Sequence, residues 1–174
     1  MNGLKLLENS YINIGKVPNL KFNKGYSISF WYKLEEDIDD YYDIIAPVIS
    51  NEDGTFNIGL YRAGYAFGSK SNNLRGVGCR TVHKGLYEFV CLSITDDDIP
   101  SIIISRNDDY GKQSTITSPA SWGFSDLADM ELRIGNVTVY GVKNYPIYLH
   151  SISVYDKVLT EDEVRAIYRG GFRI

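Results

Sequence analysis

The sequence predicts an all-β fold, a sandwich or barrel with one short C-terminal helix, formed by a single domain over residues 1–174. Three observations support this prediction. Isoleucine occurs 19 times and valine 11 times against six alanines, and β-branched side chains favour strands. Turn-forming residues recur along the chain at the spacing that is typical of sandwiches and barrels. A chain of 174 residues is also long enough to bury a core as one domain.

Strands are predicted where apolar and polar residues alternate, or where short apolar runs lie between turns. The clearest is 26–34, whose alternation indicates a strand with one buried face. Asp53-Gly54 predicts a hairpin between 44–49 and 56–61, because glycine accepts positive φ at little cost. Lys84-Gly85 predicts a second hairpin between 76–82 and 87–95. The full set of predicted strands is 4–7, 11–14, 26–34, 44–49, 56–61, 65–67, 76–82, 87–95, 101–105, 114–117, 131–135 and 147–155.

One helix is predicted over residues 161–169. Thr160 is the expected N-cap and Glu163 completes a capping box, while Leu159 and Val164 occupy the positions of a hydrophobic staple. Gly170 and Gly171, which follow, are expected to end the helix. We expect the helix to cover a sheet surface through Val164 and Ile167.

The two cysteines are expected to be free thiols. If Lys84-Gly85 forms a two-residue turn, Cys79 lies opposite Val90, and Cys91 faces the other side of the sheet. A one-residue shift would bring the cysteines together, but it would place Arg80 on the core face, and such register slips are disfavoured where one face is buried.

Composition excludes several classes of partner. A net charge of −4 argues against a protein that binds nucleic acid by neutralising phosphates. The longest apolar run is too short for a transmembrane helix, so we expect no membrane insertion. The start of the chain lacks the apolar stretch of a signal peptide. Two cysteines and two histidines that are scattered along the chain do not indicate a zinc site.

The sequence does not indicate an enzyme. Retaining glycosidases need two carboxyl groups about 5–5.5 Å apart, and the nearest acidic motif is 35–40, which we interpret as a solvated loop. His83 lies near a turn and His150 in a strand, and neither belongs to a recognisable catalytic set. Glycoside hydrolase is therefore only the third hypothesis.

Loop aromatics are the candidate ligand-binding groups, because flat rings with polar tips can stack on sugars or anchor proteins. Trp122 is the first candidate, with Asp126 as a polar neighbour, although Trp122 could instead plug the open end of a sandwich. We expect no cofactor other than calcium, which favours several oxygen ligands. The remaining ligand-binding candidates are Tyr110, Tyr41 and Tyr42, and the metal candidates are Asp96, Asp98, Asp108 and Asp109.

Four segments, in order, carry a family resemblance. They are LLENSYINIG, GYSISFWYKL, LYEFVCLSI and ELRIGNV followed by YPIYLHSISVYDKVLTEDEVRAIYRGG. Together they resemble the laminin-G-like domains of the concanavalin-A-like lectin and glucanase superfamily, which includes the pentraxins. The resemblance implies a jelly-roll of two antiparallel sheets. His150 and Ser151 stand where these domains usually carry an acidic pair, and Trp31 matches a position that is usually structural.

The resemblance implies a non-catalytic recognition module for glycan or another cell-surface ligand, within a larger extracellular or virion assembly. The alternative is a structural or decoration module of a phage virion or tail without its own ligand. We expect an extracellular or virion-associated location. With no signal peptide in this chain, that expectation needs either excision from a longer secreted protein or release inside a viral particle.

Overall fold

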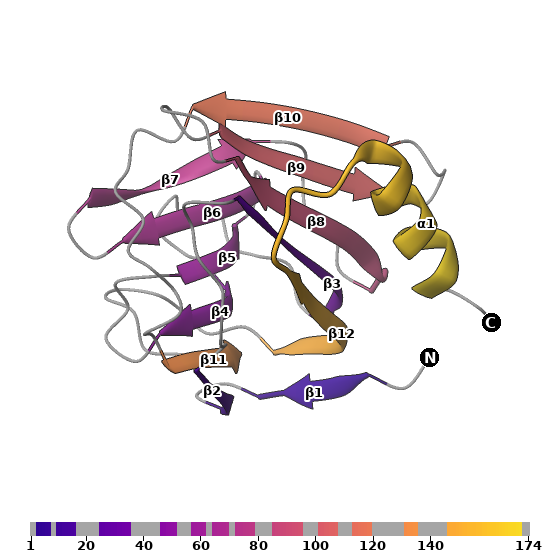
Figure 1. Cartoon of the computed structure of the whole chain (residues 1–174). Helices are drawn as coiled ribbons and strands as arrows, with labels where there is room; N and C mark the ends of the chain where they lie inside the picture. The colour runs from indigo at the N-terminus through magenta and orange to yellow at the C-terminus, as the bar shows by residue number, and fades with distance from the viewer. Residues whose placement is uncertain are drawn as a thin grey trace.

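A computed structural model gives the fold. It describes residues 3–7, 10–16, 25–35, 46–51, 57–61, 64–69, 72–78, 85–95, 101–107, 113–119, 131–135 and 146–171. Within these residues the elements are β1 (Leu4–Leu6), β2 (Tyr11–Lys16), β3 (Tyr26–Leu34), β4 (Ala46–Asn51), β5 (Asn57–Tyr61), β6 (Gly64–Ser69), β7 (Asn72–Gly78), β8 (Glu88–Ile94), β9 (Ser101–Asn107), β10 (Gln113–Pro119), β11 (Glu131–Gly135), β12 (Ile147–Tyr155) and α1 (Glu161–Gly171) (Figure 1).

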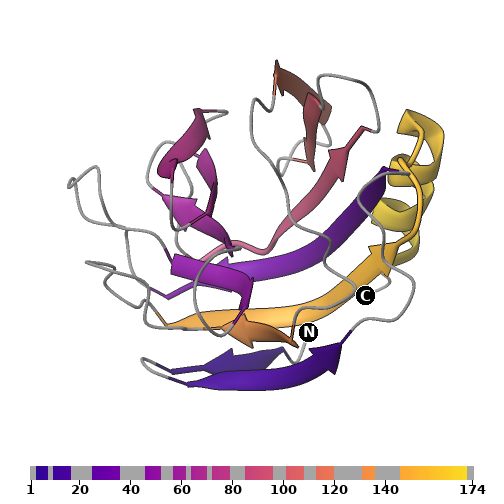
Figure 2. The ribbon, with the colours of Figure 1, turned by 60° about the vertical axis from the view of Figure 1, so that its left-hand side comes forward.

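The strands form two sheets. Sheet A has the order β1-β12-β3-β8-β9-β10, and sheet B has the order β2-β11-β4-β5-β6-β7. All the strand pairs described are antiparallel. The sheets lie face to face, and α1 lies at one end of sheet A (Figure 2). The prediction of two antiparallel sheets with one C-terminal helix is therefore confirmed.

One predicted hairpin is confirmed and the other is wrong. β4 and β5 pair as expected, with Ile49 opposite Ile58. In contrast, β7 pairs with β6 in sheet B, whereas β8 lies between β3 and β9 in sheet A. Val90 consequently lies opposite Phe30 and Arg106 instead of Cys79. Turn residues between two strands do not show whether the strands pair or enter different sheets, and here distant strands supply the better partners.

Strand β3 is buried on both faces, which corrects the expectation of one buried face. Its even-numbered residues face sheet B, and Phe30 and Tyr32 are fully buried there. On the outer face, Ser27, Ser29 and Trp31 are buried as well. The physical reason is that α1 and the segment before it cover this part of the outer face. The alternating pattern predicted the strand correctly, but it could not show that the outer face is buried under the helix.

The cover of the outer face is an aromatic and aliphatic cluster. Trp31 and Phe89, neighbours on β3 and β8, have ring centroids 5.3 Å apart, and the ring of Tyr168 stacks on Trp31 at 5.4 Å. Cys91 and the buried Val164 complete the contact between sheet and helix, together with Leu159. The predicted packing of the helix through Val164 is confirmed. Ile167 is partly buried against the same cluster.

The helix begins as the sequence predicts. The Glu163 N–H donates to Thr160 Oγ1 at 3.3 Å, and the Thr160 N–H donates to Glu163 Oε2 at 2.9 Å, which is a reciprocal capping box. The helix extends to Gly171 and does not stop before Gly170. A Cβ atom at 171 would lie 2.7 Å from Nε1 of Trp31, so glycine there allows the last turn to approach the indole.

The segment before the helix is fixed by a buried hydroxyl. Ser27 Oγ donates to the Lys157 carbonyl at 2.9 Å and accepts from the Leu159 N–H at 2.9 Å. It also lies 2.7 Å from Ser93 Oγ on the neighbouring strand. Ser27 thereby joins sheet A to the start of α1. The free thiol of Cys91 lies under the same cover, and burial raises its pKa to about 12.

Candidate functional site

The described residues offer few groups for metal or covalent chemistry. Among them, no cluster of three or more His, Cys, Asp or Glu side chains could hold a metal ion. No described helix is both long and apolar enough to cross a membrane. His150 is exposed at a bulge in β12, between Leu149 and Ser151.

The residues that the sequence analysis selected lie outside the described residues. This is true of every ligand-binding candidate: Trp122, Asp126, Tyr110, Tyr41 and Tyr42. It is also true of the calcium candidates Asp96, Asp98, Asp108 and Asp109, and of Cys79 and His83. These assignments stay predictions.

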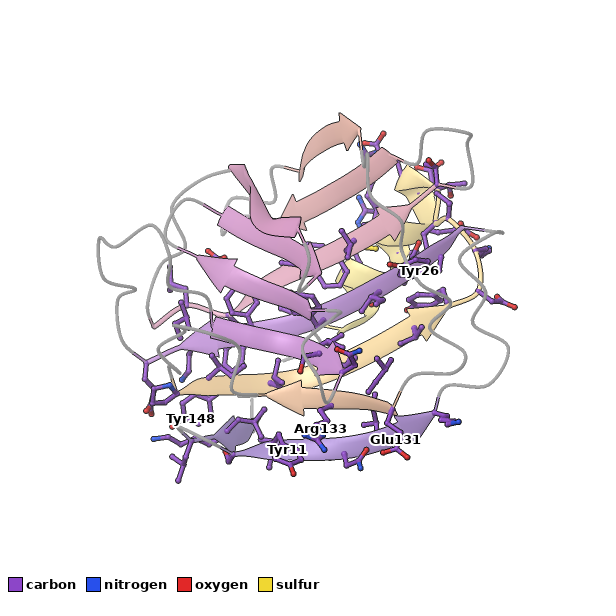
Figure 3. All side chains as sticks on the ribbon, turned by 90° about the vertical axis from the view of Figure 1, so that its left-hand side faces the viewer. Tyr11, Tyr26, Glu131, Arg133 and Tyr148 are labelled. Carbon is purple, nitrogen blue, oxygen red and sulfur yellow. The ribbon has the colours of Figure 1, made fainter. Side chains whose placement is uncertain are left out.

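A different group of side chains gathers on the outer face of sheet A, next to the part that α1 covers, and its Tyr87 packs against the Trp31 and Phe89 cluster. We call it the Lys/Tyr row: Lys5, Tyr148, Lys33 and Tyr87, with Glu35 beside it. The register places Lys5 of β1 opposite Tyr148 of β12, and Tyr148 opposite Lys33 of β3. Tyr87 directly precedes β8, next to Lys33. Figure 3 shows Tyr148 at the end of the sandwich opposite Tyr26.

Glu35 connects one end of the row. Lys5 Nζ lies 2.7 Å from Glu35 Oε2, and the Tyr148 hydroxyl donates to Glu35 Oε1 at 2.6 Å. The hydrogen bonds from these two donors lower the pKa of Glu35, and the bond from Lys5 has the larger effect. The same contacts with Glu35 raise the pKa of Lys5 and that of Tyr148. At neutral pH the site therefore presents an ionised carboxylate, an ammonium and a protonated phenol.

Two aromatic rings hold the second ammonium of the row. Lys33 Nζ lies 4.5 Å from the ring centroid of Tyr148 and 5.2 Å from that of Tyr87, within the range of cation–π attraction. The Gly85 N–H donates to the Leu34 carbonyl at 2.8 Å, with φ of +81° at Gly85, which ties the segment before Tyr87 to the end of β3. The rings and charges of the row are thus positioned by strands and by a tight turn.

The row has the groups that sugar recognition needs. Aromatic faces can stack on apolar sugar faces, while carboxylate and ammonium groups make strong hydrogen bonds to hydroxyls or acidic substituents. Tyr148 is partly exposed, and Lys5 and Glu35 are exposed beside it. The sequence places Glu35 only in an acidic stretch that we interpreted as a solvated loop. The missed signal was the placement of Lys5, Lys33 and Tyr148 on outward positions of their strands, which becomes informative once the strand order is known.

A second surface differs in chemistry. Large exposed apolar side chains lie on or beside the edge strands β1 and β2, namely Leu4, Leu7, Tyr11, Ile12 and Ile14. Arg133 of β11 lies over the Tyr11 ring at 4.5 Å, and Figure 3 shows these two residues along the lower edge of the sandwich. This surface could contact another protein, but its exposed apolar side chains offer few polar groups to orient a sugar.

Comparison with known proteins gives a fold relationship. No family model matches the chain, and no curated protein matches its sequence. Among solved structures, the chain is similar to a botulinum neurotoxin serotype D/C binding domain (TM-score 0.69, 14% identity), covering 97% of this chain and 43% of that one. It is also similar to the binding domain of botulinum neurotoxin DC in complex with rat synaptotagmin II (TM-score 0.65, 12% identity, 98% and 46% covered). The same neurotoxin binding domain has been solved in complex with SialylT (TM-score 0.67, 12% identity, 97% and 42% covered).

These similarities establish the fold: a β-sandwich like that of the neurotoxin binding domains. The chain spans less than half the length of the solved structures that it matches.

Proposed function

We propose that this chain is a non-catalytic recognition module that binds glycan on a cell surface through the Lys/Tyr row. The observation that carries the proposal is the row itself, where the partly exposed Tyr148 ring lies beside Lys5, Glu35 and Lys33 on a rigid sheet. The similar solved structures include a neurotoxin domain in complex with SialylT and one from work on entry through two ganglioside molecules. They support binding as the role of this fold without assigning a ligand to this chain.

The chemistry of the row favours binding over hydrolysis. Glycosidases need one carboxyl group with a raised pKa as the general acid. The pKa of Glu35 is lowered instead, by hydrogen bonds from Lys5 and Tyr148. A carboxylate held in this way can accept hydrogen bonds from sugar hydroxyls, but it is a poor proton donor.

A glycan array followed by titration calorimetry tests the proposal. Tyr148→Ala removes the apolar contact surface and should weaken binding of the best array ligand about tenfold or more, since burying a large apolar side chain contributes on the order of 1.5–3 kcal/mol. Tyr11→Ala is the matched control, because it removes an exposed tyrosine from sheet B, and binding should stay within about twofold. Unchanged affinity in Tyr148→Ala would remove the row from the proposal.

The same titration tests the loop candidates from the sequence. If Trp122 binds ligand, Trp122→Ala should weaken affinity while the melting temperature changes little. A drop of roughly 3–5 kcal/mol in the free energy of unfolding would instead identify Trp122 as a packing residue. Calcium binding through Asp96, Asp98, Asp108 or Asp109 predicts that EDTA lowers the melting temperature and that added calcium restores it.

The alternative proposal is a structural module of a larger extracellular or virion assembly, such as a phage tail. The observation that favours it is the exposed apolar surface of β1 and β2. Ile12→Lys should abolish assembly without lowering glycan affinity if this surface contacts other subunits. The assignment to the laminin-G-like domains is also a proposal. It rests on the four sequence segments that resemble those domains.

A further inference from the structure

We infer that the Lys/Tyr row selects glycans that carry an anionic group, a carboxylate or a sulfate, and that Lys33 binds this group. The inference rests on the proposed function, because it concerns the same surface. It starts from the charges of the row, where two lysines and one glutamate leave one positive charge on a chain whose net charge is −4.

Both lysines lie over the Tyr148 ring, Lys5 at 5.4 Å and Lys33 at 4.5 Å from its centroid, but their other partners differ. Lys5 forms an ion pair with Glu35 at 2.7 Å, so its charge is balanced within the row. Among the described residues, Lys33 has no carboxylate within 4.0 Å; its ammonium lies between the rings of Tyr148 and Tyr87. Ring faces attract a cation without neutralising it. Glu35 also attracts Lys33 at longer range, but its direct contact is with Lys5. Lys33 is therefore the cation of the row that has no carboxylate in contact among the described residues, and it is available to an external anion.

The geometry gives the anion a defined place. Tyr148 is shared by both halves of the row: its hydroxyl contacts Glu35, and its ring contacts Lys33. A sugar that lies against Tyr148 can thus hydrogen-bond Glu35 on one side and place an acidic substituent beside Lys33 on the other. A carboxylate or sulfate at Lys33 Nζ would form charge-assisted hydrogen bonds, which are about twice as strong as neutral ones.

Three probes with one core separate this inference from the proposed function: lactose, 3′-sialyllactose and lactose 3′-sulfate. Calorimetry at low ionic strength should show both acidic probes binding about tenfold more tightly than lactose, the scale of one charged hydrogen bond. Lys33→Gln should reduce this preference, measured as the ratio of the acidic-probe affinity to the lactose affinity of the same variant, to less than about twofold. Lys33→Arg should retain the preference, and Lys16→Gln, on sheet B, is the matched control and should have no effect.

The outcomes are distinguishable. Equal binding of the three probes, or a preference that survives in Lys33→Gln, would overturn the inference and leave the proposed function standing. If none of the array glycans or probes binds, the proposed function fails as well. A further arm uses vesicles of phosphatidylserine, which carry charge without sugar. Binding to them that depends on Lys33 and matches the affinity for 3′-sialyllactose would show that the row recognises anionic lipid, and would also overturn the inference.

Discussion

Replacing Ser27 by alanine tests how sheet A and the helix are joined. The Ser27 hydroxyl is fully buried and has three partners: the Lys157 carbonyl, the Leu159 N–H and the hydroxyl of Ser93. Alanine fits the same space because only the oxygen is removed. The Leu159 N–H and the Ser93 hydroxyl then lose their partner under the cover formed by α1.

The expected cost follows from those lost partners. A buried donor or acceptor that loses its hydrogen bond costs about 1–3 kcal/mol, and partial access of water near the exposed Lys157 reduces the total. We therefore expect Ser27→Ala to lower the free energy of unfolding by about 2 kcal/mol. For a chain of this length, that corresponds to a drop of roughly 4–8 °C in melting temperature.

Urea denaturation followed by tryptophan fluorescence measures the effect, because Trp31 lies in the affected cluster. Ser151→Ala is the matched control: Ser151 is an exposed serine of β12, opposite Trp31, and its loss should change stability by less than about 0.5 kcal/mol. If Ser27→Ala lowered the free energy of unfolding no more than Ser151→Ala, the Ser27 hydroxyl would not stabilise the contact between sheet A and the start of α1.

Four further results are expected. Thr160→Ala should cost on the order of 1 kcal/mol by removing the N-cap acceptor, with helix content checked by circular dichroism, and no change would mean that the cap frays in solution. Contacts with Lys157 and then Thr160 lower the pKa of Glu163 from 4.5 to about 2. The contribution of Glu163 to the free energy of unfolding should therefore be complete above about pH 4.5 and should fade as the pH falls toward 2. In Glu163→Gln, the free energy of unfolding should lack this part of the acid dependence. Gly135→Ala should destabilise the chain by at least about 2 kcal/mol, because φ at Gly135 is +104° and the added methyl group would lie 2.9 Å from the backbone oxygen of Ser10. A variant with an unchanged melting temperature would contradict this backbone geometry. In a Cys79→Ser variant, Cys91 should resist a thiol reagent at pH 8 until denaturant is added, because burial raises the pKa of Cys91 to about 12. Rapid labelling of the folded chain would show that α1 moves away from Cys91.

Local chemistry was sufficient to predict most of the elements, although β7 begins at Asn72 and not at Gly76 as the sequence predicts. The capping box at Thr160 and Glu163 depends on residues three apart, so the sequence alone locates the start of α1. The β4–β5 hairpin follows from Asp53-Gly54 in the same way, because a short turn leaves few alternatives. The hairpin at Lys84-Gly85 was wrong because its outcome depended on strands far away in the sequence.

The candidate site could not be predicted by local rules. Lys5, Lys33 and Tyr148 come from three strands that are widely separated along the chain, and only the order β1-β12-β3 makes them neighbours. Even their direction is not local, since the bulge at His150 changes which residues of β12 face outward. Tyr148 lies on a strand, so the general preference for ligand-binding aromatics in loops does not indicate it.

Composition, periodicity of two and the capping box by themselves determined that this protein is an all-β chain with a single capped C-terminal helix. These features act over a few residues, where side-chain volume, backbone conformation and nearby hydrogen bonds dominate. Only the tertiary structure decided that β3 is covered on both faces, that Ser27 is a buried joint and that Lys33 lies between two tyrosines. Each of these outcomes is a contact between segments far apart in the sequence, and the choice among such contacts depends on the free energy of the whole packed sandwich.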